Sequence, residues 1–310
     1  MSALICGSMA FDTIMVFPDK FKHHILPEQV HILNVSFLVP ELRREYGGCA
    51  GNIAYNLKLL GGDPLIMATV GKDFTPYAQW LGYCGIKQDY IKVLDDSYTA
   101  QAYITTDMDD NQITAFHPGA MSFSHQNTVP HDAGIRLGLV SPDGKEGMLQ
   151  HAEQFAAAGI PFIFDPGQGM PMFDGAELLH LLEKAHWLTL NDYEAQLMQE
   201  RTGLSPEEMA ERVEALIITR GGNGSLIFTG GDIIEIPPAR PHAVLDPTGC
   251  GDAYRAGLVF GLLEGLDWAV TGRIASLMGA MKVETYGTQN HSFTLAAFKE
   301  RYRENYGSSF

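Results

Sequence analysis

Positively charged residues are scarce in this chain. Of its 310 residues, 21 are Lys or Arg and 37 are Asp or Glu, which gives a net charge of −16. Proteins that bind nucleic acid or anionic membranes electrostatically need clustered Lys and Arg. The composition therefore argues against nucleic-acid and membrane partners. An anionic ligand must instead be held by backbone N–H groups and a few local cations.

Cysteine is also rare, and no two of the four cysteines form a C-x-x-C pair: Cys6, Cys49, Cys84 and Cys250. This spacing predicts neither a zinc ribbon nor a disulfide framework, and it fits a reducing compartment. The first 12 residues lack a basic region and have only a short apolar run, so we expect no signal peptide. No stretch approaches the roughly 18 apolar residues of a membrane span. We therefore expect a cytoplasmic protein.

Three common catalytic motifs are absent. The sequence has no G-x-x-x-x-G-K-[ST], no G-x-G-x-x-G after its first predicted strand, and no G-x-S-x-G. These absences exclude a P-loop kinase, a Rossmann dehydrogenase and an α/β-hydrolase. His180, Glu183 and His186 have a metal-like spacing. The second histidine, however, lies about 120° away from the first around a helix, so we expect no metal site there.

What the chain does contain is a regular alternation of short buried strands and helices. We predict strands at 3–6, 65–70, 137–141, 162–165, 187–190, 215–219, 224–228 and 233–236. We predict helices at 53–60, from 75 onward, at 146–158, from 206 onward, at 252–264 and at 267–284. This order is typical of an α/β protein with a mostly parallel, doubly wound sheet between two layers of helices. Ligands bind beyond the carboxyl ends of such strands.

Two segments do not follow this alternation. Residues 98–117 are rich in Thr, Tyr and Ile around a turn at 109–111, which predicts a hairpin. Residues 13–46 are interrupted by three prolines and look irregular, with one further strand expected within 30–37. We therefore expect a single domain over 1–310 with a small β-lid inserted at 13–46 and 98–117.

The most informative stretch is 246–257, where a loop of small residues leads directly into a helix. Gly249, Cys250 and Gly251 allow backbone N–H groups to converge at the positive end of that helix, which favours an anion such as a transferring phosphoryl group. Asp252 stands at the same point and can accept a proton from an attacking hydroxyl. The sequence thus predicts an anion hole at 249–252 with Asp252 as general base. A first-turn acid that only stabilises the helix is the alternative.

A second glycine-rich stretch lies about 200 residues earlier, at 47–54 (GGCAGNIA). Together the two stretches resemble the two signatures of the ribokinase-like (PfkB) sugar and nucleoside kinases, in the right order. Cys250 departs from the family pattern, which usually has Ala or Gly there. The resemblance implies the ribokinase-like three-layer αβα fold. Segments 43–48, 112–121 and 246–252 look most like the nucleoside kinases of the adenosine-kinase branch.

The resemblance also implies how an acceptor is held. Asp12 matches the family acid that binds the ribose hydroxyls, since a carboxylate can hold a vicinal diol. Gly47, Gly48 and Asn52 match the family's sugar contacts. Asn52 could equally be the N-cap of the following helix.

The same resemblance places the phosphate donor. Asn191 and Glu194 match the family's N-x-x-E motif, which organises Mg²⁺ through water. Thr219, Gly221 and Gly224 match the T-x-G-x-x-G loop that binds ATP.

Several positions keep more than one interpretation. Asp246 and Thr248 match positions that hold a monovalent cation, K⁺, in potassium-activated members of the family. Arg255 lies one turn after Asp252, where it could orient that carboxylate, contact phosphate, or pair with another carboxylate. Arg43 or Arg44 could reach the transferring phosphate, and the sequence does not choose between them.

Aromatic residues in the lid bear on the acceptor, because a nucleobase stacks on a π-face and a simple sugar does not. The candidates are Phe11, Phe17, Tyr103 and Phe116, each of which could instead be an ordinary sheet residue. We expect Phe116 to contact the base.

These observations predict an ATP- and Mg²⁺-dependent kinase that phosphorylates the 5′-hydroxyl of a ribonucleoside, of the adenosine, inosine, guanosine or cytidine type. A ribose-type sugar kinase of the same family is the second hypothesis. A nucleoside or sugar sensor without turnover is the third. We expect either a monomer or a homodimer joined through the lid.

Overall fold

The computed structural model describes residues 2–25, 34–109, 111–130 and 134–310. Its larger sheet has nine strands in this spatial order: β13 (Asp232–Ile236), β12 (Ser225–Thr229), β11 (Ala215–Thr219), β10 (Trp187–Asn191), β9 (Phe162–Phe164), β8 (Ile135–Val140), β1 (Ser2–Cys6), β4 (Asp63–Gly71) and β5 (Lys87–Leu94). All neighbouring pairs are parallel except those made by β12, which is antiparallel to β11 and β13. The prediction of a mostly parallel sheet is confirmed.

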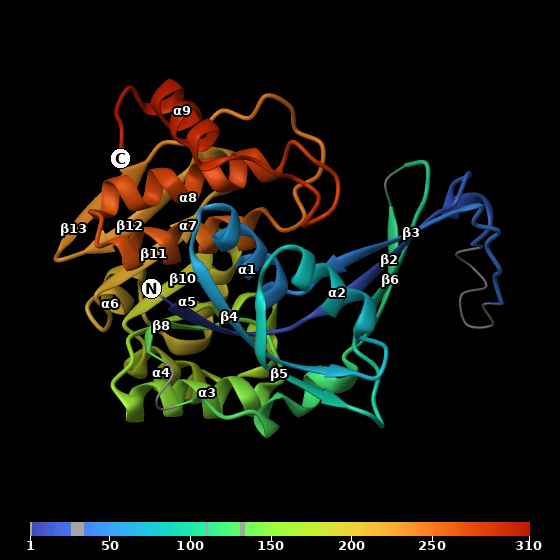
Figure 1. Ribbon diagram of the computed structural model, residues 1–310, viewed down its shortest axis with the longest axis horizontal. Coiled ribbons are helices and arrows are strands. Elements are labelled where there is room, and N and C mark those ends of the chain that lie inside the picture. The colour runs from blue at the N-terminus through green and yellow to red at the C-terminus, as the bar shows by residue number, and fades with distance from the viewer. Residues whose placement is uncertain (1, 26–33, 110, 131–133) are drawn as a thin grey trace.

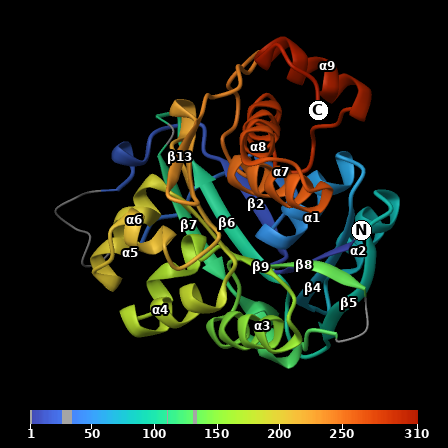
Figure 2. The same ribbon diagram turned by 90° about the vertical axis from the view of Figure 1, so that its left-hand side faces the viewer.

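Helices cover both faces of this sheet (Figures 1 and 2). One apolar core joins the sheet to α1 (Cys49–Leu59), α2 (Thr75–Tyr83), α7 (Cys250–Glu264) and α8 (Trp268–Lys282). A second core on the opposite face contains side chains of α3 (Lys145–Ala158), α4 (Gly175–Lys184), α5 (Asp192–Thr202) and α6 (Pro206–Ala210). Helix α9 (Leu295–Tyr306) packs outside α8 in a third cluster. The layers therefore run helix, sheet, helix, as in an αβα sandwich.

Local sequence signals explain several helix ends. Ser205 and Glu208 form a reciprocal capping box at the start of α6, as the sequence predicted. Gly159 ends α3 in the left-handed conformation. The sequence did not reveal β5, α4 or α9. Short 3₁₀ turns complete the described structure: η1 (Phe21–His23), η3 (Gly119–Gln126), η4 (Gly167–Met172) and η5 (Gly221–Asn223).

A separate four-stranded sheet projects to one side of the layers (Figure 1). Its order is β3 (Glu41–Gly47), β2 (Ala10–Val16), β6 (Ala100–Thr106) and β7 (Gln112–His117). We call it the lid. The predicted hairpin at 98–117 is its β6–β7 pair, and Asp110 in the expected turn lies outside the described residues.

The expectation for residues 13–46 was less accurate. This segment contributes two lid strands, which pair with each other and, through β2, with β6. The prolines did not prevent this, because Pro18 and Pro40 lie outside the strands. Of the strand expected within 30–37, residues 30–33 lie outside the described residues, and 34–37 have no regular secondary structure.

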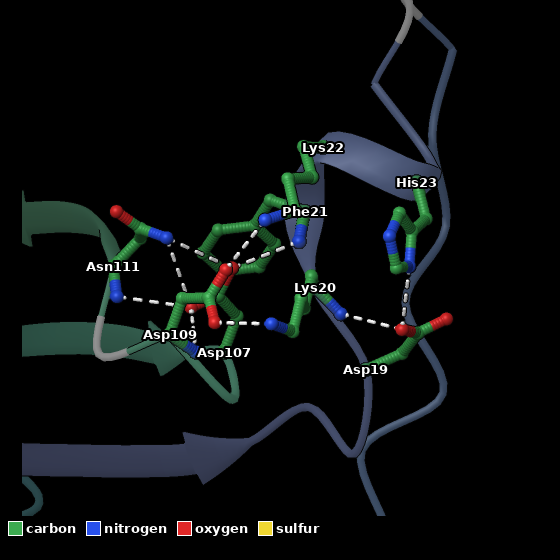
Figure 3. Close-up of polar contacts among 8 residues, drawn as sticks. All are labelled: Asp19, Lys20, Phe21, Lys22, His23, Asp107, Asp109 and Asn111. Atoms are coloured by element: carbon green, nitrogen blue, oxygen red, sulfur yellow. Dashed lines mark hydrogen bonds and ion pairs between the residues drawn. The ribbon is translucent and has the colours of Figure 1, made fainter.

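The outer end of the lid is fastened by one carboxylate (Figure 3). Asp107, after β6, accepts hydrogen bonds from the backbone N–H groups of Phe21, Asp109 and Asn111, each at 2.9 Å. Two of these donors belong to the β6–β7 turn, and Phe21 belongs to η1 after β2. Asp107 thus ties the ends of two lid strands together. None of the helices formed by the described residues combines the length and apolar character needed to cross a membrane.

Candidate active site

The lid and the large sheet meet where β1 leads into β2. The backbone N–H of Ala50 donates to the carbonyl of Ser8 at 3.0 Å, and the N–H of Cys49 donates to its hydroxyl at 3.1 Å. Between them Gly48 adopts φ = +86°, and a Cβ there would lie 2.6 Å from the Cα of Met9. Only glycine fits this close approach. The first signature therefore fixes the start of α1 against the base of the lid.

Asp12, the predicted ribose-binding acid, lies at this junction. Its Oδ2 would be only 2.6 Å from a Cβ on Gly47, so the carboxylate rests against that glycine. Burial raises the pKa of Asp12 to about 6, with further repulsion from Glu45 and Asp246. None of the groups that shift this pKa is a cation. A ligand that donates hydrogen bonds to the carboxylate, such as a diol, would offset the cost of burying its charge.

Strand register separates the lid aromatics into two faces. Asp12 pairs with Ala102, and Ala102 pairs with Phe116, so all three share one face of the lid. Phe116 is 53% exposed there. Phe11 and Tyr103 lie in the neighbouring rows and point to the opposite face. The register therefore leaves Phe116 as the predicted base contact.

Two of the other aromatic candidates have structural roles. Phe11 is buried against Tyr46 and Tyr77. Phe17 is buried at the outer end of the lid, where it stacks on Phe21. Neither ring is available to a base. The sequence could not separate these cases, because each ring is buried by tertiary contacts, Phe11 with Tyr77 of α2 and Phe17 with Phe21 of η1.

Asp252 lies in the first turn of α7, which begins after Gly249 in the left-handed conformation at φ = +78°. Its Oδ2 accepts a hydrogen bond from Nδ2 of Asn52 at 2.8 Å. Burial raises the pKa of Asp252 to about 6, while the bond from Asn52 and the charge of Arg255 oppose this shift. A carboxyl group with such a pKa is close to the range that suits a general base at neutral pH.

The N–H groups of this turn form part of the predicted anion hole. Those of Gly251 and Asp252 are in the first turn and have no partner within the helix. The N–H of Cys250 instead donates to the carbonyl of Pro247 at 3.1 Å, which closes the turn. Burial raises the pKa of the Cys250 thiol to about 11, so it is neutral. Because the Cys250 N–H is already bonded to the Pro247 carbonyl, it does not face an anion in this structure, contrary to the expectation.

Asn52 is the fourth residue of α1 and not its N-cap, because the N-cap is Gly48. The capping interpretation of Asn52 is therefore wrong. Its amide is instead oriented by a chain of buried contacts. The indole N–H of Trp80 donates to Oε1 of Gln289 at 2.9 Å, and Nε2 of Gln289 donates to Oδ1 of Asn52 at 3.0 Å.

The direction of this chain is fixed at both ends. An indole N–H can only donate, and an ionised carboxylate can only accept. Starting from Trp80, each amide must therefore accept with its oxygen and donate with its nitrogen, until Asn52 donates to Asp252. Gln289 thus positions the candidate base indirectly. Sequence reasoning missed it, since it lies in a loop 237 residues from Asn52.

A cavity of about 360 Å³ opens beside the same helix start. Its lining includes the predicted ATP loop, Thr219, Gly221 and Gly224, and the predicted anion-hole residues Cys250 and Gly251. Other walls are mainly apolar and come from α8 and the loop before α7. The cavity brings the two predicted phosphate-binding elements together, with an apolar space suited to a flat ring between them.

Asn191 and Glu194 begin helix α5, where they form a reciprocal capping box. Oε2 of Glu194 accepts the Asn191 N–H at 2.8 Å. Burial and the charge of Asp165 raise the pKa of Glu194, and Arg255 opposes the shift. Among the described residues, no group of three or more His, Cys, Asp or Glu could enclose a metal ion. These residues suit Mg²⁺ that keeps its waters and binds mainly to phosphates.

The metal-like spacing at 180–186 finds no such use. His180 contacts Glu153, and Glu183 pairs with Arg212 at 3.1 Å. The expectation that no metal binds there stays unchanged.

Arg255 forms a buried salt bridge. Its guanidinium donates to both oxygens of Asp165, at 2.8 and 2.9 Å, and lies 3.8 Å from Glu194. This outcome selects the carboxylate-pairing interpretation of Arg255. The partner Asp165, at the end of β9, was not among the predicted site residues. A buried bidentate pair of this kind costs several kcal/mol to break, so it holds α7 rigidly against the sheet.

The structure also distinguishes the two arginines before the first signature. The Arg44 guanidinium lies 3.6 Å from the ring centre of Phe11 and 3.6 Å from Asp73. Arg43 lies two residues from Glu45 on β3 and so shares the face of the lid that carries Asp12. Arg43 is therefore the better candidate for a phosphate contact.

Asp246 is engaged by backbone rather than left open. Its Oδ1 accepts the N–H of Thr248 and its Oδ2 accepts the N–H of Gly287, each at 2.9 Å. A buried lysine, Lys282, donates to the Asp246 carbonyl at 2.8 Å. A protein cation therefore already contacts Asp246, one of the two residues of the expected monovalent-cation site.

Comparison with known proteins gives consistent relatives. The profile of the pfkB family carbohydrate kinases matches residues 10–294. The nucleoside kinase of Methanocaldococcus jannaschii is 33% identical over 271 residues, which cover 86% of this chain and 89% of that protein.

Solved structures agree. The nucleoside kinase of Burkholderia thailandensis in complex with inosine is 52% identical and has a TM-score of 0.90 over 99% of both chains. The M. jannaschii nucleoside kinase, described as an archaeal member of the ribokinase family, is 30% identical with a TM-score of 0.89 over 98% of both chains. Because the family profile matches most of the chain and the solved relatives share its fold, the chain belongs to the pfkB family of carbohydrate kinases, which transfer phosphate to a hydroxyl group.

Proposed function

We propose that this protein is an ATP-dependent nucleoside kinase that phosphorylates the 5′-hydroxyl of a ribonucleoside. The observation that carries the proposal is the position of Asp252. Its carboxylate accepts from Asn52 on one side, and the next residue back, Gly251, lines the nucleotide cavity. The base therefore stands between the acceptor side and the donor side of the site.

The acceptor side favours a nucleoside over a free sugar. Asp12 and the exposed Phe116 share one face of the lid, so a ribose diol and a flat base could be held by the same surface. The relatives support this choice, since the B. thailandensis protein has been solved with inosine and with ADP-inosine.

Each step of the transfer has a residue of this chain. Asp252 would take the proton of the 5′-hydroxyl while that oxygen attacks the γ-phosphorus of ATP and ADP leaves. The N–H groups of Gly251 and Asp252 would stabilise the charge on the transferring group. Thr219, Gly221 and Gly224 would border the nucleotide. Asn191 and Glu194 would reach Mg²⁺ through water, and that ion would neutralise phosphate charge.

The proposal also covers the location and the assembly of the protein. The four free cysteines support the proposal of a cytoplasmic protein. The two proposed assemblies, a monomer and a homodimer joined through the lid, differ twofold in mass and can be separated by sedimentation.

An ADP-release assay with Mg·ATP tests the function. The acceptors are adenosine, inosine, guanosine, cytidine and ribose. We expect turnover on nucleosides, and Asp12→Ala should raise the nucleoside KM by roughly 10–100-fold with a smaller change in kcat, because the diol loses its partner. Turnover on ribose alone would replace the proposal with a sugar kinase. Nucleoside binding without turnover would indicate a sensor.

A further inference from the structure

Lys282, the last residue of α8, is completely buried. Its Nζ donates to the carbonyl oxygens of Asp246 at 2.8 Å and Thr285 at 3.2 Å. It also lies 3.9 Å from Oδ2 of Asp246. A lysine is rarely buried in this way, because an ammonium group out of water needs compensating oxygens. Asp246 and Thr285 supply them.

These oxygens resemble the ligands of a monovalent cation. Potassium ions are bound in proteins by carbonyl oxygens that replace the hydration shell. An ammonium group is a compact charge with three donors, so it can satisfy a similar set of oxygens. Here Lys282 takes up the Asp246 carbonyl, and N–H groups of Thr248 and Gly287 take up the carboxylate. A K⁺ site at Asp246 and Thr248 therefore does not fit this chain.

The ammonium connects two elements that the reaction needs. Asp246 begins the loop that leads through Gly249 into the first turn of α7. Thr285 begins the segment that contacts lid strand β3, where the Thr288 hydroxyl donates to the Tyr46 carbonyl at 2.5 Å. Nζ of Lys282 bonds to both elements. Its charge thus links the start of the anion-binding loop to the segment that contacts the lid.

We propose that Lys282 is a built-in cation that holds the anion-binding loop in position, so that activity does not depend on K⁺. The inference rests on the proposed kinase function, and it makes Lys282 a positioning residue. Under this proposal the protein needs no potassium activation. The physical reason is that a tethered charge pays no binding entropy and is present at any salt concentration.

The first test is a cation series on the unmodified protein. Turnover of the best nucleoside is measured in K⁺, Na⁺ or choline chloride at constant ionic strength. We expect kcat to change by less than about twofold among the three salts. Activation by K⁺ of about tenfold or more over choline would overturn the inference. Absence of turnover in every salt would instead count against the proposed function, so the two failures are distinguishable.

The second test removes the charge while keeping the volume. Lys282→Met should lower kcat about tenfold or more in choline, and K⁺ or NH₄⁺ should restore part of it. Melting temperature gives a readout without turnover: K⁺ should stabilise Lys282→Met relative to choline and leave the unmodified protein unchanged. If neither cation restores activity or raises the melting temperature of the folded variant, the oxygens do not form a cation site.

Lys92→Met is the matched control. Lys92 also donates to a backbone carbonyl, that of Gln126 at 3.1 Å, but it is exposed on β5. Its replacement should leave kcat and the response to salt unchanged. A Lys92→Met variant that acquired the same K⁺ response would show that the effect is not specific to the buried site.

Discussion

The outer end of the lid and the candidate active site both contain buried or half-buried carboxylates, but the pKa values of these carboxylates shift in opposite directions in the two regions. Burial acts against the charge of Asp107, but four N–H donors from Phe21, Asp109 and Asn111 outweigh it, and its pKa falls to about 2. In the candidate active site, burial prevails, and the pKa values of Asp12 and Asp252 rise to about 6.

This difference separates structure from chemistry. A carboxylate that is saturated with donors is a stable anion and serves to fasten chain segments. A buried carboxylate with few donors is a stronger base and an unsatisfied acceptor, which suits proton transfer and ligand binding. An aspartate therefore has a structural role at the lid tip, and the same residue type has a candidate catalytic or binding role in the candidate active site.

The largest expected effect on turnover comes from removing the candidate general base, Asp252. Asp252→Asn should lower kcat by about 10²–10⁴-fold with little change in nucleoside affinity, since an amide cannot take the proton. Steady-state kinetics and a nucleoside titration measure the two quantities. In the unmodified protein kcat, measured at saturating nucleoside so that protonation of Asp12 does not contribute, should fall as the pH drops through about 6, because protonated Asp252 is inactive. The residual activity of the variant should lack this dependence.

Glu207→Gln is the matched control, since Glu207 is a first-turn acid of α6. It should leave kcat unchanged. Activity of Asp252→Asn within about threefold of the unmodified protein would reduce Asp252 to a helix-stabilising acid of the same kind.

A smaller effect should follow from loosening the support of that base. Gln289→Leu removes the group that orients Asn52, so the bond from Asn52 to Asp252 weakens. Because that bond lowers the pKa of Asp252, its loss should move the acid limb of the pH–rate profile to higher pH. We expect kcat to fall about 3- to 30-fold.

A pH profile separates positioning from simple destabilisation. Gln289→Glu keeps the shape of the side chain but replaces the donor to Asn52 with an acceptor, so it should not restore activity. A fall in melting temperature with an unchanged pH profile would make Gln289 a packing residue only.

The smallest effect on turnover should come from the lid tip. Asp107→Asn places an amide among N–H donors, so the melting temperature should fall while kcat stays within about twofold. Thermal unfolding and steady-state kinetics measure the two. Asp109→Asn is the control, because Asp109 makes surface ion pairs with Lys20 and Lys22, which contribute little to stability. Loss of kcat in Asp107→Asn without loss of stability would remove the distinction between the two regions.

The features that could be predicted from the sequence are those that short segments encode. Residues 47–54 and 246–257 carry the family signatures, and helix starts such as Ser205 follow from capping chemistry that acts over three or four residues. The alternation of buried strands and helices predicted the layered fold for the same reason, since each element buries its own apolar face. The family and the nucleoside-kinase branch agree with the relatives found.

Contacts between residues far apart in the sequence became visible in the three-dimensional structure alone. Gln289 is an ordinary loop residue in sequence, and Lys282 matches the common preference for a cation at a helix end. Asp165 follows a buried strand with no signal of its partner. Strands β2 and β3 were missed because their pairing is completed by β6, which lies more than 50 residues away. Such contacts depend on packing between distant segments, and no local pattern encodes them.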